Sequence, residues 1–388
     1  MEKMCGPGRM SVAETIYVAV NVLFVAKYSA RIAGGGVLPA ALCVLLAIAA
    51  YAVLLRWLMP RLPGGDIARR TSSGQIACGV VLLAFAGMAT LQYAIDPYGI
   101  QVDRWSALHF PIRNLLSGTY PYSACTHLGG YASPFPVWQV LHIPFYLLGN
   151  VGLSFFVAAI LFLCSCRKVQ GREGALAAGL LLCSSVAVWY EAAVRSDLIT
   201  NMLLLAAIVN YIFPRLSQQW VEKRRWRIAC GVGLLASTRI IVLVPVALLL
   251  CPYLSKMKLR RQCEVTMLAL MVFALTFVPF ALWDWQEFYY FQNNPWALQT
   301  RQGSLLDFVL FVPLGLFLAW NHGGDARRYY RNTAAMLCAF VLVTFLHNMW
   351  QSGNWALFSS SYDITYFTSA IPFCLLAYCV QRRRMCHL

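Results

Sequence analysis

The sequence predicts an all-α integral membrane protein, a polytopic helical bundle of about 10–12 spans within one transmembrane domain covering residues 1–388. Two observations carry this prediction. Of the 388 residues, 60% are hydrophobic and 12% are charged, whereas a soluble domain is about half apolar and roughly a quarter charged. The basic residues also stand in short runs beside apolar stretches, for example Arg167-Lys168 and Arg382-Arg383-Arg384, as in the cytoplasmic loops of membrane proteins.

Apolar stretches approaching the roughly 20 residues of a spanning helix define the expected spans. They are residues 12–26, 37–55, 75–95, 151–166, 174–190, 198–213, 265–282, 305–320, 333–349 and 362–380. Two further stretches are unusual, because 133–148 contains three prolines and 228–254 is interrupted by Ser237-Thr238-Arg239. If the first lies at or dips into the outer surface and the second is a hairpin of two short helices, every basic run falls on one side.

The basic runs then place the N- and C-termini in the cytoplasm, and we expect a multi-pass protein of the bacterial cytoplasmic (inner) membrane. The net charge of +16 arises from these runs, so membrane lipids are expected partners and nucleic acid is not. Residues 96–132 form a long extracytoplasmic loop that carries polar and aromatic side chains. Loops of this length are often functional, so we expect it to form part of an active site.

The segment DPYGIQVDRW, from Asp96 to Trp105, directly follows the third span. A carboxylate held near apolar walls can serve as a general base, and Arg104 could bind a phosphate or keep its neighbour Asp103 ionised. The alternative for Asp96 is a helix cap, in which its side chain accepts hydrogen bonds from free backbone N–H groups. Asp103 lies deep in the loop and is the stronger catalytic candidate, with Asp96 second.

Two arginines near the outer surface are candidates for binding an anion. Arg195 follows Glu191 by four residues, so the two could form a helical ion pair, or Arg195 could face an anionic headgroup. Arg239 stands at the tip of the predicted hairpin, where a charge near the membrane usually faces a cavity and a partner. The alternative is an arginine that extends to the outer headgroups.

Five further residues are expected to contact substrate: His109, Tyr122 and His127 in the long loop, Asp197 before the sixth span, and His347 near the outer end of its span. A lone histidine is more often an ordinary hydrogen-bonding residue than a ligand. No metal-ligating residue is assigned and no cofactor is required by the sequence, although a divalent cation remains open.

Together these features resemble the GT-C glycosyltransferases, multi-span enzymes that use polyprenyl-phosphate sugars. The resemblance rests on the acid-bearing first outer loop with Asp96 and Asp103, the Pro-rich stretch SPFPVWQVLHIPF, and ASTRIIVLVP at 236–245. The last is similar to a segment of polyprenyl-phosphate-mannose-type mannosyltransferases. The resemblance implies an inverting transfer of a mannose-like hexose to a lipid-linked or glycan acceptor, with Asp103 as general base. The acids of this loop stand seven residues apart, whereas the family often shows a tight pair.

An enzyme of this kind also needs cations for the departing phosphate, and Arg239, Arg195 and Arg104 are the candidates. The main alternative is a polytopic transporter or lipid flippase without transferase activity. Transporters usually show internal repeats and broken or charged helices near the membrane midplane. The sequence shows no repeat, and its acids cluster at the outer ends of the predicted spans. A non-catalytic scaffold is a third possibility.

Overall fold

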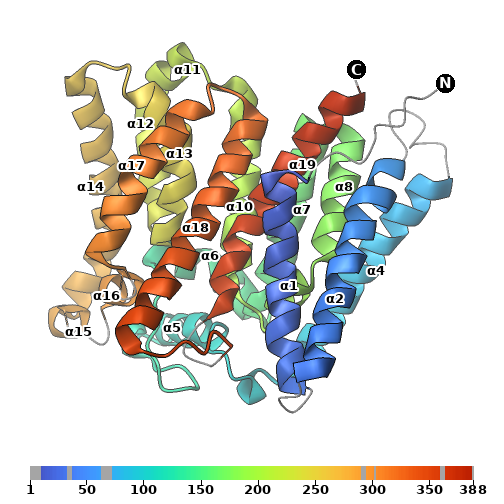
Figure 1. The fold of residues 1–388 in the computed structure, drawn as a ribbon. Helices are drawn as coiled ribbons and strands as arrows, with labels where there is room; N and C mark the ends of the chain where they lie inside the picture. The colour runs from blue at the N-terminus through green and yellow to red at the C-terminus, as the bar shows by residue number, and fades with distance from the viewer. Residues whose placement is uncertain are drawn as a thin grey trace.

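The computed structural model describes residues 10–32, 37–62, 72–289, 294–300, 303–358 and 363–386, and these form a bundle of helices with no β-strand among them (Figure 1). The start of α1 (Val12–Ile32), the end of α19 (Ile371–Cys386) and α11 (Gln218–Lys223) lie at one end of the bundle, which we call the terminal end. The short helices α5 (Ser106–Leu116), α15 (Trp285–Tyr289) and α16 (Pro295–Thr300) lie at the opposite end, which we call the α5 end.

Among the described residues, eight helical segments are long and apolar enough to cross a membrane. They are built on α1 (Val12–Ile32), α2 (Val37–Val53), α4 (Ser72–Ala94), α7 (Ser154–Val169), α10 (Asp197–Ile212), α14 (Leu259–Trp283), α18 (Ala326–Ser352) and α19 (Ile371–Cys386). Short turns extend four of these segments: η1 (Leu54–Leu58) and η2 (Met59–Arg61) follow α2, η5 (Val151–Leu153) precedes α7, η6 (Phe213–Arg215) follows α10, and η8 (Ile364–Ala370) precedes α19.

A ninth span results if the bent pair α8 (Gly171–Ser184) and α9 (Val186–Ala193) is counted as one. The predicted polytopic helical bundle is therefore confirmed. The expected 10–12 spans also counted shorter helices, notably α17 (Leu305–Asn321), which falls below the length of a span.

The predicted hairpin over 228–254 is also found. It consists of α12 (Arg225–Ala236) and α13 (Leu243–Leu254), separated by Ser237-Thr238-Arg239 and the short turn η7 (Ile240–Val242). The start of α12 and the end of α13 both lie at the terminal end, opposite the tip (Figure 1). The Pro-rich stretch forms α6 (Pro136–Leu147), which is too short to span. The backbone N–H of Phe135 donates to the Thr238 carbonyl over 3.4 Å, so the start of α6 meets the hairpin tip.

The bend between α8 and α9 is 70° and leaves backbone groups that need partners inside the bundle. Side chains of α1 and α2 provide them. The Tyr17 hydroxyl donates to the Leu181 carbonyl (2.6 Å), the Tyr51 hydroxyl donates to the Ser184 carbonyl (2.9 Å), and the Asn21 side chain accepts from the Ala187 N–H (3.1 Å). The bend is therefore built into the packing and turns Glu191, at the end of α9, into the α5 end.

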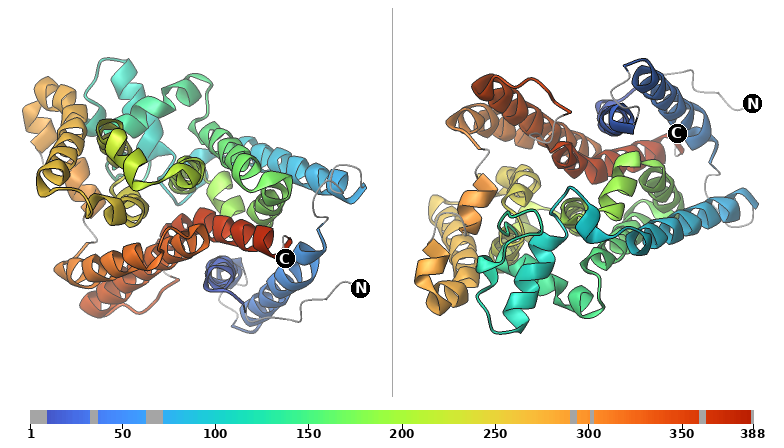
Figure 2. Two further views of the ribbon diagram at one scale, coloured as in Figure 1. Left: turned by 90° about the horizontal axis from the view of Figure 1, so that it is seen from above. Right: turned by 90° about the horizontal axis from the view of Figure 1, so that it is seen from below.

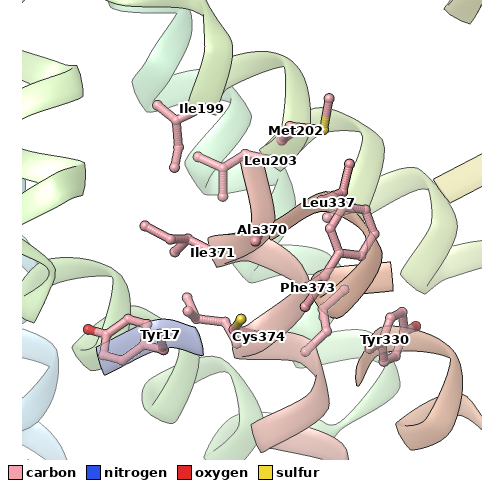
Figure 3. Packing of buried hydrophobic residues seen from close by; sticks show 14 of the residues in the cluster. Tyr17, Ile199, Met202, Leu203, Tyr330, Leu337, Ala370, Ile371, Phe373 and Cys374 are labelled. Carbon is pink, nitrogen blue, oxygen red and sulfur yellow. The ribbon is translucent and has the colours of Figure 1, made fainter. Parts of the chain in front are cut away.

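The main core lies where α10, α18 and α19 meet beside α1 (Figure 3). Ile199 and Leu203 of α10 face Ile371 and Phe373 of α19, and all four are fully buried. The span built on η8 and α19 is the most deeply buried, whereas the one built on α2 exposes most of its apolar side chains. Figure 2 shows α1 and α2 at the edge of the bundle, where exposed leucines suit a lipid environment.

The loop 96–132 contains α5 and two single turns, η3 (Pro97–Gly99) and η4 (Pro121–Ser123). Most of α5 is buried against α6, and Trp105, Leu108 and Trp138 form a small apolar cluster between them. The predicted long loop is therefore folded, and it packs against α6 at the α5 end.

Candidate functional site

A buried ion pair joins Arg239 at the hairpin tip to Asp197 at the start of α10. The Arg239 guanidinium donates from Nε to Oδ2 over 2.9 Å, and from Nη2 to Oδ1 over 2.7 Å and to Oδ2 over 2.6 Å. The side chains are only 7% and 2% exposed. The indole of Trp138 on α6 also donates to Asp197 Oδ2 over 2.7 Å. One carboxylate thus fastens α6, α10 and the hairpin tip together.

A second ion pair fastens the loop to the C-terminal part of the chain. The Arg104 guanidinium donates to Asp363 Oδ2 over 2.5 Å and lies 4.7 Å from the ring centre of Tyr366 in η8. The Arg104 side chain is 10% exposed and that of Asp363 is 35% exposed. Burial alone would lower the pKa of Arg104, but Tyr366 and Asp363 raise it well above its ordinary value.

Asp363 is held in its ionised form. Burial by itself would raise the pKa of this carboxyl, but the Arg104 guanidinium and the hydrogen bonds from Thr365 lower it below its ordinary value. Thr365 contributes its backbone N–H at 3.0 Å and its hydroxyl at 2.6 Å, both donating to Asp363 Oδ1. Asp363 therefore caps η8 and binds Arg104 with its other oxygen.

Glu191 lies near both of these pairs. Its side chain is fully buried, and the Ser196 side chain interacts with its carboxyl group. The charges of Arg104, Asp363 and Asp197 all act on it. Lys27 of α1, which is buried, interacts electrostatically with Asp363. We call Arg104, Glu191, Asp197, Arg239 and Asp363 the buried charged cluster.

Arg195 does not pair with Glu191, so that interpretation of their spacing was wrong. Its guanidinium donates to the backbone carbonyls of Gln92 and Ile95, the latter over 3.1 Å, and so caps the end of α4. Its backbone is left-handed, with φ of 55°, and burial lowers the pKa of its guanidinium. A Cβ on Gly152 would lie 2.8 Å from Arg195 Cγ, so this arginine is tightly enclosed.

Asp103 lies half-buried at the edge of the folded loop. The Thr126 hydroxyl donates to its Oδ2 over 3.2 Å, and a Cβ on Gly130 would come within 3.0 Å of the same oxygen. Oδ1 has no hydrogen-bond donor within the described part of the chain. Asp103 therefore has one fixed and one available oxygen, and its neighbour Arg104 belongs to the buried charged cluster.

Asp96 is exposed, and its side chain accepts from the Tyr98 N–H over 3.1 Å at the start of η3. The expected cap is confirmed. Its charge acts on Arg195, but no hydrogen bond links it to the buried charged cluster within the described residues. A catalytic role for Asp96 stays a prediction.

The loop histidines have distinct surroundings. His127 joins two parts of the loop, since its Nδ1 lies 2.6 Å from the Ser106 hydroxyl and its Nε2 lies 2.8 Å from the Ile100 carbonyl. His109 stacks on Trp105 at 4.7 Å, and burial, with the charges of Arg113 and Arg195, lowers its pKa to about 4. His109 is therefore neutral near pH 7, and its buried Nδ1 has no hydrogen-bond partner among the residues that the structure describes.

Tyr122 and His347, which were also predicted to contact substrate, form no hydrogen bond with a described residue of the buried charged cluster. Tyr122 is fully buried, and its hydroxyl donates to the Pro134 carbonyl over 3.2 Å. Burial raises the pKa of this phenol well above its ordinary value, so it remains neutral. His347 lies half-buried on α18, five residues before the helix ends at Ser352. Substrate contacts of both residues stay predictions.

The structure adds residues that sequence reasoning did not assign to the site: Lys27, Trp138, Glu191 and Asp363. The sequence could have indicated Lys27, because a lysine at the end of an apolar span usually has a functional or structural partner. It could also have indicated Asp363, because this residue directly precedes the last apolar stretch. Their convergence depends on tertiary contacts, since Arg104 and Asp363 lie 259 residues apart.

Within the described ranges, no group of three or more His, Cys, Asp or Glu side chains is arranged to hold a metal ion. Family models, curated proteins and solved structures give no match to this chain. The α5 end combines the Asp103 carboxylate, which has one oxygen without a donor among the described residues, with the guanidinium group of its sequence neighbour Arg104 in the buried charged cluster. Such an arrangement can accept a proton and stabilise an anion.

Proposed function

We propose that the protein is a membrane glycosyltransferase that moves a hexose, mannose-like in class, from a polyprenyl-phosphate donor to a lipid-linked or glycan acceptor. The observation that supports this most is the adjacency of Asp103 and Arg104. Asp103 offers a free carboxylate oxygen at the loop edge, while Arg104 enters a buried charged cluster at one end of an apolar helical bundle. These are the two charges that transfer from a phosphate-linked sugar requires. The resemblance to the GT-C glycosyltransferases agrees with it.

In the proposed reaction, Asp103 accepts the proton of an acceptor hydroxyl as that oxygen attacks C1 of the donor sugar. The bond between C1 and the phosphate oxygen breaks, and polyprenyl phosphate leaves with the bonding electrons. Attack opposite the leaving group inverts the configuration at C1. General base catalysis typically contributes about 10²–10⁴-fold, and a fixed cation stabilises the charge that grows on the phosphate.

The arginines differ in how easily they could bind this phosphate. Arg239 is deeply buried and binds both oxygens of Asp197, whereas Asp363, the partner of Arg104, is 35% exposed. An entering phosphate can displace an exposed carboxylate at lower cost than a buried one. Arg104 is therefore the first candidate for binding the phosphate. Arg239 holds the surrounding helices in place through Asp197. Arg195 is a weaker candidate, because its guanidinium already donates to backbone carbonyls.

One observation favours the alternative of a transporter or flippase. The pair Arg239–Asp197 is buried at the tip of the hairpin of α12 and α13, and buried charges beside interrupted helices are common in transporters. The folded loop at the α5 end favours the transferase, because ordered structure around the candidate base suits chemistry shielded from water better than passage of a substrate.

The purified protein in liposomes distinguishes these possibilities. A polyprenyl-phosphate hexose labelled in the sugar is supplied with a lipid-linked acceptor, and both sugar transfer and donor movement across the bilayer are measured. We expect label to appear in the acceptor, with inverted configuration at C1. Movement of intact donor without transfer, under conditions in which a known transferase is active, would favour the flippase and contradict the proposal.

A further inference from the structure

The terminal end carries a second charged feature, unrelated to the buried charged cluster. Lys168 in the last turn of α7 and Arg215 in η6 both approach the ring of Tyr211 in the last turn of α10. Lys168 Nζ lies 4.8 Å from the ring centre and 3.3 Å from the phenol oxygen. Arg215 Cζ lies 4.1 Å from the same ring centre, and its guanidinium donates to the Tyr211 carbonyl.

These two cations have no carboxylate partner among the described residues. Neither forms a salt bridge with a carboxylate within the described part of the chain, and both side chains are exposed, as is Tyr211 at 40%. Cations do favour the C-terminal ends of helices, where the helix dipole is negative. That effect accounts for a basic residue on each helix end, but it does not account for two like charges held on one phenol ring.

The position of the three residues relative to the membrane indicates what could neutralise them. Lys168 and Arg215 each lie within the last two residues of an apolar 19-residue segment, 151–169 and 197–215. A segment of this length just crosses the hydrocarbon core, so both charges fall at the level of the lipid headgroups. Basic residues at that level attract anionic lipids.

We propose that Lys168, Tyr211 and Arg215 bind the phosphate of an anionic phospholipid headgroup at the terminal end. The guanidinium can donate two parallel hydrogen bonds to phosphate oxygens, the ammonium adds a point charge, and the phenol adds a further donor. The exposed ring holds the two cations apart at fixed positions. This site is independent of the proposed transferase activity.

The test uses the full chain in lipid nanodiscs that contain phosphatidylglycerol and phosphatidylcholine. Native mass spectrometry measures how many molecules of each lipid remain bound. Lys168→Gln with Arg215→Gln should lower phosphatidylglycerol retention by about fivefold for each charge removed, and phosphatidylcholine should be unaffected. Tyr211→Phe, which keeps the ring, should cause a smaller loss.

The matched control is Lys256→Gln with Lys258→Gln, which removes two exposed positive charges at the same end, just before α14. Circular dichroism and monodisperse elution confirm that each variant is folded. Equal losses in the test and control variants would show only diffuse attraction and would overturn the site. Competition of retained lipid by millimolar inorganic phosphate would indicate a site for free phosphate instead.

Discussion

The buried pair of Arg239 and Asp197 allows the sharpest test of the fold around the site. Arg239→Met keeps an unbranched side chain of similar length but removes the guanidinium. Asp197 would then keep only the Trp138 indole as a donor, while 2% exposed. Breaking a buried ion pair by removing one partner costs about 3–5 kcal/mol, because an uncompensated charge remains inside the protein. We expect a loss of that size in the free energy of unfolding.

The reciprocal change, Asp197→Asn, leaves the Arg239 guanidinium without its carboxylate and should cost a similar amount. The double variant removes both charges, so its loss should be smaller than the sum of the two single losses by about 2 kcal/mol or more. Unfolding is followed by tryptophan fluorescence in mixed micelles as the fraction of denaturing detergent rises. Arg260→Met is the control, because its ion pair with Glu264 is 91% exposed on the arginine side and should contribute under about 1 kcal/mol.

A loss below about 1 kcal/mol for Arg239→Met, or additive losses in the double variant, would refute this reasoning. Either result would mean that water reaches the pair or that Asp197 finds another partner. The expected loss has a consequence for function. Reduced transfer by an Arg239 variant would not by itself assign this residue to the phosphate, since the site would also be disordered.

Three further predictions concern other parts of the chain. Asp363→Asn should lower the free energy of unfolding by about 1–2 kcal/mol at pH 7. Because the folded-state pKa of Asp363 is lowered, the greater stability of the wild type should persist above about pH 4 and disappear as pH falls below that value. Equal stability of the two proteins at pH 7 would contradict the ion pair. Glu191→Met should raise stability by about 1–2 kcal/mol, because it removes a fully buried carboxyl that forms no salt bridge with a described residue, yet it should lower transfer. A destabilised variant would show that the interaction of Glu191 with the Ser196 side chain outweighs the cost of burying the carboxyl. An impermeant maleimide should label the native, exposed Cys125 in intact cells, and Cys125→Ser is the control for this reaction. A cysteine placed at Gln219 in α11 should react only after the cells are permeabilised. The reverse pattern would show that the topology is inverted.

Much of the fold could be predicted because it depends on local apolar length. The break at Ser237-Thr238-Arg239 within an overlong apolar stretch, and the basic residues at both of its ends, were sufficient to predict the hairpin of α12 and α13. The cap at Asp96 was also predictable, because an acid before Pro-Tyr-Gly commonly accepts from the following N–H groups. In each case the deciding residues lie within one segment.

The partners of the charges could not be predicted in the same way. Spacing suggested that Arg195 pairs with Glu191, but the turn after α9 places Arg195 against the end of α4, about 100 residues away in sequence. Asp197 was expected to contact substrate, and nothing local indicates that Arg239 and Trp138 occupy its carboxylate. These contacts follow from how α6, α10 and the hairpin tip pack, which one sequence does not specify at the level of single side chains.

The transferase proposal depends most directly on Asp103. The decisive measurement is the initial rate of hexose transfer from a polyprenyl-phosphate donor by wild type, Asp103→Asn and Asp96→Asn in liposomes, together with donor binding by each. Asparagine preserves the size of the side chain and can still accept from Thr126, but it cannot take a proton. The account predicts that Asp103→Asn lowers the rate by about 10²–10⁴-fold while donor binding survives, and that Asp96→Asn has a small effect. Near-normal transfer by Asp103→Asn would contradict the account.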